Sequence, residues 1–133
     1  MTRIESETVK VGGSQKNTFD FLSDLNNIGS LMPEQVEDWE CDGEKCSFKI
    51  KGMASLGMKY EEKVADSKLV LREEGKSPFP FKLICSIGEG EENCDLQLAL
   101  EAELNPMMEM LAKKPLKNFL DLLVNEYSKR GIA

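Results

Sequence analysis

Hydrophobic and polar residues alternate along most of the first three quarters of the chain, a pattern typical of β-strands with one buried face. The alternation is clearest near the end of this stretch, where every second residue from Leu96 to Leu104 is apolar. The pattern predicts an antiparallel sheet with one apolar and one polar face. Its strands are expected at residues 3–11, 36–41, 45–51, 53–65, 68–73, 81–87 and 94–104.

Two other segments have apolar residues at helical spacing. The first begins at Ser14 and ends before Pro33. The second covers residues 106–129, where Asn105 is a good N-cap and Pro106 suits the first helical position. The apolar residues that define the two stripes are Phe19, Leu22, Leu25 and Ile28 in the first helix, and Leu116, Phe119, Leu120, Leu123 and Tyr127 in the second.

Pro115 lies inside the second predicted helix, where proline removes a backbone hydrogen bond and clashes with the carbonyl group four residues earlier. Met107, Met108 and Met110 precede it. In one interpretation, a bend at Pro115 raises the first part of the helix, and the methionines adapt to a ligand beneath it. In the other, the bend follows the curvature of the sheet and the methionines belong to the core. The sequence alone favours neither.

The order of these elements, together with "TFDFLSDLNNIGSLMPEQV" at residues 18–36, resembles the START-like or SRPBCC superfamily. This superfamily includes the birch-pollen-allergen fold, lipid-transfer START domains and polyketide cyclase-like proteins. The resemblance implies an α+β helix-grip fold: a curved antiparallel sheet of about seven strands wrapped around a long C-terminal helix, with short helices after the first strand. We expect one such domain over residues 1–133. The matching residues are Phe19, Leu22, Asp24, Asn27, Met32 and Pro33.

Charge and composition exclude several classes of function. The chain has 24 acidic and 17 basic residues, a net charge of −7, which disfavours nucleic acid and anionic lipid surfaces as partners. We expect no stable membrane insertion and a cytoplasmic location, because the sequence has neither a membrane-spanning apolar stretch nor the apolar run of a signal peptide. The chain has no histidine, so catalysis by a Ser–His or Cys–His pair is excluded.

The four cysteines match no zinc-binding spacing, and neither a metal nor another cofactor is predicted. They flank turns in two pairs, so Cys41 could face Cys46 and Cys85 could face Cys94 across hairpins. In a reducing cytoplasm we expect free thiols packed as small apolar groups instead.

In the superfamily, the space between sheet and helix often holds an apolar ligand, so the inner faces of both elements supply the candidate binding residues. Ordinary core packing would produce the same apolar pattern. Three candidates are polar: Tyr60 and Glu62 share the phase of Met58, and Tyr127 lies on the helical stripe. A polar group in an apolar cavity needs a partner, which a ligand could supply. Solvent exposure at the strand end would also explain Glu62, and rings with their hydroxyls at the rim would explain the tyrosines.

The candidate ligand-binding residues are Phe48, Ile50, Met58, Tyr60, Glu62, Leu71, Phe81, Leu83, Leu98, Leu100, Met108, Leu111, Phe119, Leu120 and Tyr127. They favour a protein that binds a small apolar or amphipathic molecule, such as a lipid, an isoprenoid or an aromatic metabolite, over an enzyme. No catalytic residue is assigned.

Two alternatives stay open. A cyclase- or dehydratase-like enzyme would use Tyr60 or Glu62 as acid–base groups, because burial can raise the pKa of a carboxyl group toward neutrality. The cyclase-like members of the superfamily often use histidine, which this chain lacks. An interaction module without a ligand would instead use the acidic surface to bind a protein partner.

Overall fold

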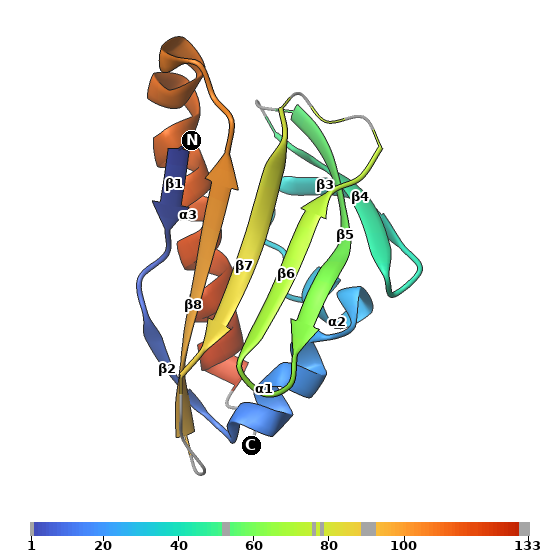
Figure 1. Ribbon diagram of the computed structural model, residues 1–133, viewed down its shortest axis with the longest axis vertical. Helices are drawn as coiled ribbons and strands as arrows, with labels where there is room; N and C mark the ends of the chain where they lie inside the picture. Colours follow the sequence, from blue (N-terminus) through green and yellow to red (C-terminus); the bar gives the residue numbers. More distant parts are fainter. Residues whose placement is uncertain (1, 52–53, 76, 78, 89–92, 131–133) are drawn as a thin grey trace.

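A curved antiparallel sheet lies against one long C-terminal helix, as the helix-grip prediction requires (Figure 1). The structure is a computed structural model that describes residues 2–51, 54–75, 77, 79–88 and 93–130. The strands are β1 (Thr2–Glu5), β2 (Val9–Gly12), β3 (Val36–Cys41), β4 (Lys45–Ile50), β5 (Ala54–Val64), β6 (Lys68–Glu73), β7 (Phe81–Ile87) and β8 (Asn93–Ala102). The helices are α1 (Gln15–Leu22), α2 (Leu25–Gly29) and α3 (Pro106–Arg130).

The sheet has the order β1-β8-β7-β6-β5-β4-β3, and β2 also pairs with β8. The single strand predicted at residues 3–11 is therefore two strands, which gives eight strands instead of about seven. Ser6 separates them. Its backbone N–H donates to the Leu98 carbonyl at 2.8 Å, and its hydroxyl accepts from the Leu98 N–H at 2.9 Å. A side chain thus replaces one bond of the ladder, and the chain turns between β1 and β2.

Side-chain caps fix where the helices begin. The Ser14 hydroxyl accepts from the Asn17 N–H at 3.1 Å, and the Asn105 side chain accepts from the Met108 N–H at 2.8 Å. The first predicted helix is split in two, because Asp24 has an extended backbone and caps α2 separately. Asn105 was identified as the cap of α3 from the sequence, and the structure confirms it.

The predicted hairpin at Asp42-Gly43 joins β3 to β4. Gly43 has a φ of 98°, which favours glycine, and the Asp42 carboxylate accepts from the N–H groups of Glu44 and Lys45, both at 3.0 Å. This hairpin sets Cys41 directly opposite Cys46.

The four cysteines are free thiols. The hairpin pairing suggested for Cys85 and Cys94 is wrong, because Cys85 pairs with Leu98 and Cys94 pairs with Val11.

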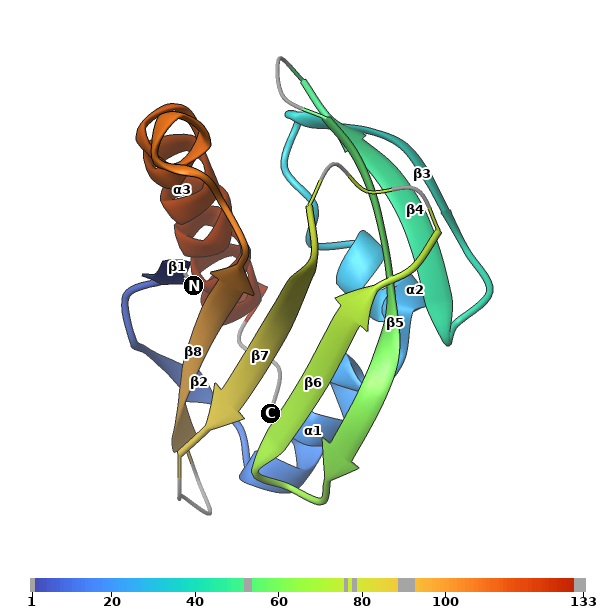
Figure 2. The same ribbon diagram turned by 45° about the horizontal axis from the view of Figure 1, so that its top comes forward.

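The buried side chains of the core lie between the sheet and the helices. Figure 2 shows how these elements are arranged around one another. The backbone of α3 approaches β1, β2 and β8 most closely, whereas α1 lies against β6 and β7 and α2 lies against β3. Side chains rather than close backbone packing must therefore connect α3 to the far strands of the sheet. The candidate site lies in this region.

Candidate functional site

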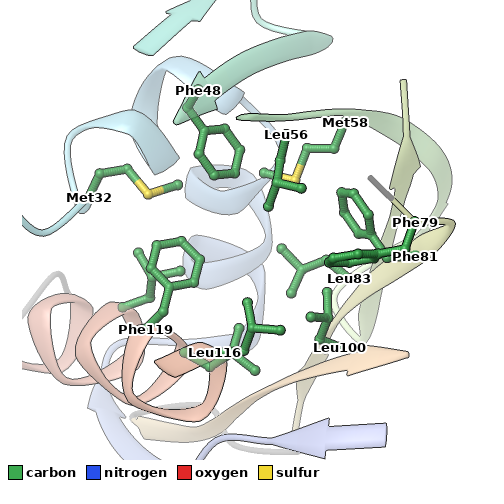
Figure 3. Close-up of a pocket in the computed structure, with 12 residues that line it drawn as sticks. Met32, Phe48, Leu56, Met58, Phe79, Phe81, Leu83, Leu100, Leu116 and Phe119 are labelled. Carbon is green, nitrogen blue, oxygen red and sulfur yellow. The ribbon is translucent and has the colours of Figure 1, made fainter. Parts of the chain in front are cut away.

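A small cavity of about 20 Å³ lies between the inner face of the sheet and α3 (Figure 3). It has room for roughly one water molecule, far less than the few hundred Å³ of a typical ligand pocket. All twelve lining side chains are apolar. They are Met32, Phe48, Leu56, Met58, Phe79, Phe81, Leu83, Leu100, Leu116, Phe119, Leu120 and Leu123.

Strand register explains why the sheet residues converge on this cavity. Phe48 of β4 is paired with Leu56 of β5, and Leu83 of β7 is paired with Leu100 of β8. Directly opposite residues of antiparallel strands point to the same face, so each pair presents two apolar side chains to α3. The helix contributes residues spaced three and four apart, which form one stripe along its inner side.

Two aromatic pairs lie on different sides of the cavity (Figure 3). The Phe48 and Phe119 rings are nearly parallel, with centroids 6.4 Å apart, and they connect β4 to α3. Trp39 of β3 extends this contact, with its ring centroid 5.4 Å from that of Phe48. Phe79 and Phe81 meet edge to face at 6.1 Å. The Phe48–Phe119 contact therefore bridges the part of the interior where the α3 backbone does not approach the sheet.

Seven of the candidate residues line this cavity, as their positions in the strands and the helix predict. Three others, Ile50, Leu71 and Leu98, are buried in the core away from the lining. The seven are Phe48, Met58, Phe81, Leu83, Leu100, Phe119 and Leu120.

Glu62 is not on the inner face, so the prediction that it shares the phase of Met58 is wrong. The register shifts between Tyr60 and Glu62, with Tyr60 opposite Leu71 but Glu62 opposite Val70. Such a bulge places one extra residue in β5 and reverses the side to which the following residues point. The Glu62 side chain is 52% exposed and lies 4.0 Å from the Lys68 ammonium group.

Tyr60 points inward but does not line the cavity. Its hydroxyl donates to the backbone carbonyl of Leu22, and the Lys63 ammonium group lies 4.2 Å from the centre of its ring. Desolvation by burial raises the pKa of Tyr60 above its usual range. Tyr60 thus ties the C-terminal end of α1 to β5 and has no free hydroxyl directed at a ligand.

Tyr127 is fully buried near the C-terminal end of α3, and it does not line the cavity either. Its hydroxyl donates to the Thr18 hydroxyl at 3.3 Å, and the Thr18 oxygen lies 3.4 Å from the Cys94 sulfur. Burial raises the pKa of Tyr127. These contacts give the Tyr127 hydroxyl a hydrogen-bond partner within the protein, so no ligand group is needed to pair with it.

The first turns of α3 contribute little to the interior. Leu111 is 73% exposed, and Met107 and Met110 are 73% and 84% exposed. Met108 is half-buried against the core but does not line the cavity. Assigning Leu111 to the site is therefore wrong. For Met107 and Met110 both interpretations are wrong, because these side chains neither lie beneath the helix nor belong to the core. Pro115 is exposed within a helix that continues through it.

Sequence reasoning missed five lining residues. Leu56 shares the phase of Met58, and Leu116 and Leu123 belong to the predicted helical stripe, so their periodicity was sufficient to find them. Met32 and Phe79 lie in connections before β3 and β7, where no regular period indicates which side chains turn inward.

Two other properties concern the described residues alone. No group of three or more Cys, Asp or Glu side chains among them is arranged to hold a metal ion. None of the described helices combines the length and the apolar character needed to cross a membrane.

Comparison with known proteins supports the fold but gives no sequence family. No protein-family description matches the chain, and no curated protein sequence does either. Among solved structures, a START superfamily protein from Mycobacterium smegmatis is 18% identical, with a TM-score of 0.68 over 97% of this chain and 96% of that one. Norcoclaurine synthase from Thalictrum flavum, solved with dopamine and hydroxybenzaldehyde, is 14% identical, with a TM-score of 0.72 over 97% and 85% of the two chains.

The protein XoxI from Bacillus cereus is 9% identical to this chain, with a TM-score of 0.78 over 98% of this chain and 96% of that one. At such low identities these likenesses show the fold alone. They confirm the START-like, helix-grip fold that the resemblance implied.

Proposed function

We propose that this protein binds a small apolar or amphipathic molecule between the sheet and α3. The observation that carries the proposal is the cavity itself, because it lies where sheet and helix meet and all its lining side chains are apolar. The fold it shares with a START superfamily protein and with norcoclaurine synthase, solved with two small aromatic molecules, adds support.

A ligand requires the cavity to enlarge from about 20 Å³. Its lining includes side chains suited to such a change. Met32 and Met58 are unbranched and adapt to irregular shapes, and Phe119 is only half-buried. In our proposal Phe119 turns away from Phe48, and the ligand takes the space between β4 and α3.

The absence of polar groups from the lining limits the chemistry of the ligand. A buried polar group on the ligand would lose its hydrogen bonds to water and find no replacement, at a cost of about 1–3 kcal/mol. We therefore propose an aliphatic chain or an aromatic ring as the buried part, with any polar end at the rim. Tyr60 and Glu62, the acid–base groups of the enzymatic alternative, do not line the cavity. The binding proposal is thus the better supported of the two.

Thermal unfolding with decanoic acid and with 1-anilinonaphthalene-8-sulfonate as probes tests this proposal. Phe119→Ala opens the cavity, and Leu122→Ala is the matched control, because Leu122 is 41% exposed on the same helix and does not line the cavity. We expect both probes to raise the Tm of the wild-type and control proteins, and to raise that of Phe119→Ala by more. If no probe raises the Tm of any of the three proteins, the proposal fails.

A further inference from the structure

Two cysteines lie directly opposite each other beside the turn of the β3–β4 hairpin. Cys41 is the last residue of β3 and is paired with Cys46, the second residue of β4. The next pair toward the turn is hydrogen-bonded, since the Asp42 N–H donates to the Lys45 carbonyl at 3.1 Å. Hydrogen-bonded and non-hydrogen-bonded pairs alternate along an antiparallel ladder. Cys41 and Cys46 are therefore a non-hydrogen-bonded pair, for which the Cα atoms are about 4.5 Å apart.

Both side chains lie on the same face of the hairpin, because directly opposite residues of antiparallel strands point to the same side. This is the inner face, since Cys46 alternates along β4 with exposed residues and shares its phase with the buried Phe48. A disulfide joins Cα atoms that are about 4.4–6.8 Å apart, so it can connect this pair without separating or shifting the strands. The other two cysteines of the chain are paired with apolar residues and face no thiol.

The two thiols differ in exposure. Cys41 is half-buried, and its thiol donates to the side-chain oxygen of Asn26 at 2.9 Å. Cys46 is buried, which raises the pKa of its thiol to about 12, and the neighbouring Cys41 and Asp42 add to this increase. The thiolate is the form of cysteine that attacks a disulfide. Cys41 is therefore the thiol that an external reagent reaches, whereas Cys46 reacts only slowly and only with a sulfur placed beside it.

We propose that Cys41 and Cys46 are a reversible oxidation site, which forms a disulfide on reaction with a low-molecular-weight disulfide such as oxidised glutathione. The Cys41 thiolate attacks one glutathione sulfur, which forms a mixed disulfide and releases the other glutathione as a thiolate. Cys46 then loses its proton and attacks the Cys41 sulfur, which releases the second glutathione. Two protein thiols are oxidised, one glutathione disulfide is reduced, and the two glutathione thiolates take up the two protons.

Oxidation exchanges one connection of the hairpin for another. In the reduced protein the Cys41–Asn26 hydrogen bond attaches the hairpin to α2, beside the bond from the Leu25 N–H to the Gly43 carbonyl at 3.1 Å. In the disulfide, Cys41 has no proton to donate, so the Asn26 oxygen loses this donor. In return β3, which is at one end of the strand order, gains a covalent bond to β4. The oxidation state of the pair thus determines how the hairpin is attached to α2.

Mass spectrometry of the folded protein after incubation with oxidised glutathione tests the pair. We expect the wild-type protein to lose the mass of two hydrogen atoms, and dithiothreitol to restore it. Peptide mapping without reduction should locate the new bond between Cys41 and Cys46. At equilibrium the closed disulfide should exceed the mixed disulfide at Cys41 at least tenfold, because the hairpin holds the second sulfur beside the first.

Single substitutions test the order of the two steps. Cys46→Ser should stop at the mixed disulfide and gain the mass of one glutathione at Cys41. Cys41→Ser should react at least tenfold more slowly than Cys46→Ser, because all three of its remaining thiols are buried. Cys85→Ser is the matched control and should form the same internal disulfide as the wild type. Circular dichroism of each variant verifies the fold.

A wild-type protein that stays fully reduced, or that ends as the mixed disulfide at Cys41 without closing, would overturn the proposal. So would an internal disulfide that includes Cys85 or Cys94, or a Cys41→Ser protein that reacts as fast as Cys46→Ser. Neither Cys41 nor Cys46 lines the cavity, so these outcomes are independent of whether the proposed ligand binds.

Discussion

The rings of Phe48 and Phe119 lie nearly parallel, with centroids 6.4 Å apart, and join the sheet to α3 beside the cavity. The α3 backbone itself approaches β1, β2 and β8 rather than β4. This aromatic contact therefore joins β4 to α3 where their backbones do not approach each other. It is also the contact that must open if a ligand is to enter between β4 and α3.

Phe119→Ala should destabilise the protein by about 2 kcal/mol. Full burial of a phenylalanine usually gives a loss of about 3–5 kcal/mol on truncation, and Phe119 is only half-buried. The free energy of unfolding in urea measures the loss. Phe119→Leu should cost less, because it retains apolar contact with Phe48. A Phe119→Ala protein as stable as the wild type would mean that the ring contact does not matter.

Gly57→Ala should also be destabilising, by about 2 kcal/mol, although it adds only a methyl group. A Cβ atom at this position would lie on the backbone carbonyl oxygen of Glu74, which is itself held by a 2.8 Å hydrogen bond between the Glu74 N–H and the Gly57 carbonyl. Gly12→Ala is the matched control, since a Cβ atom there meets nothing within 4 Å. The control should change the stability by less than about 0.5 kcal/mol. A tolerated Gly57→Ala would contradict the close approach of the two strands.

Pro115→Ala should raise the stability of the protein by roughly 1 kcal/mol, because it restores a backbone hydrogen bond in a helix that already continues through this position. In one of the two interpretations of the sequence, a bend at Pro115 makes room for a ligand. The lining residues of α3 all follow Pro115, however, so we expect probe affinity to stay within about twofold of the wild type. A large loss of probe affinity would contradict this expectation.

Two buried thiols should make the protein less stable at high pH. Burial raises the pKa of Cys46 and of Cys85 to about 12 each, above the value of about 8.5 for an exposed thiol. The pKa of each thiol is higher in the folded protein than in the unfolded one. The contribution of the two thiols to the free energy of unfolding is therefore complete below about pH 8.5 and is lost as the pH rises toward 12. Urea unfolding between pH 8 and pH 11 measures the loss.

Tyr60 contributes to this pH dependence in the same direction, since its pKa is also raised. Cys85→Ala isolates the share of one thiol and should give a flatter profile above pH 9. An identical profile would mean that Cys85 ionises as freely in the folded protein as in the unfolded one.

The fold was largely predictable because its signals are local. Alternation in the strands, the Asn105 cap of α3 and the Asp42-Gly43 hairpin each depend on a few neighbouring residues, and all three are found where expected. The division of the first strand was not predictable, since it depends on Ser6 bonding to Leu98, a residue distant in sequence.

The candidate site was predictable only where the period stays regular. The alternation along the strand correctly placed Met58 and Tyr60 on the inner face but gave the wrong face for Glu62. A bulge between Tyr60 and Glu62 adds one residue, and no glycine or proline in the sequence indicates it. Leu111 failed for another reason. The helical stripe that faces the core passes through Ala112 and Leu116, so Leu111 belongs to the exposed face together with Met107 and Met110.

Methyl NMR of the methionines tests ligand binding in the cavity most directly. Met32 and Met58 line the cavity, whereas Met107 and Met110 lie on the exposed face of α3. At a fixed low protein concentration, titration with decanoic acid should shift the ε-methyl resonances of Met32 and Met58 in a saturable way and leave those of Met107 and Met110 in place. Saturable shifts at Met107 and Met110 alone, or no shift at any of the four, would contradict the proposal that a ligand binds between the sheet and α3.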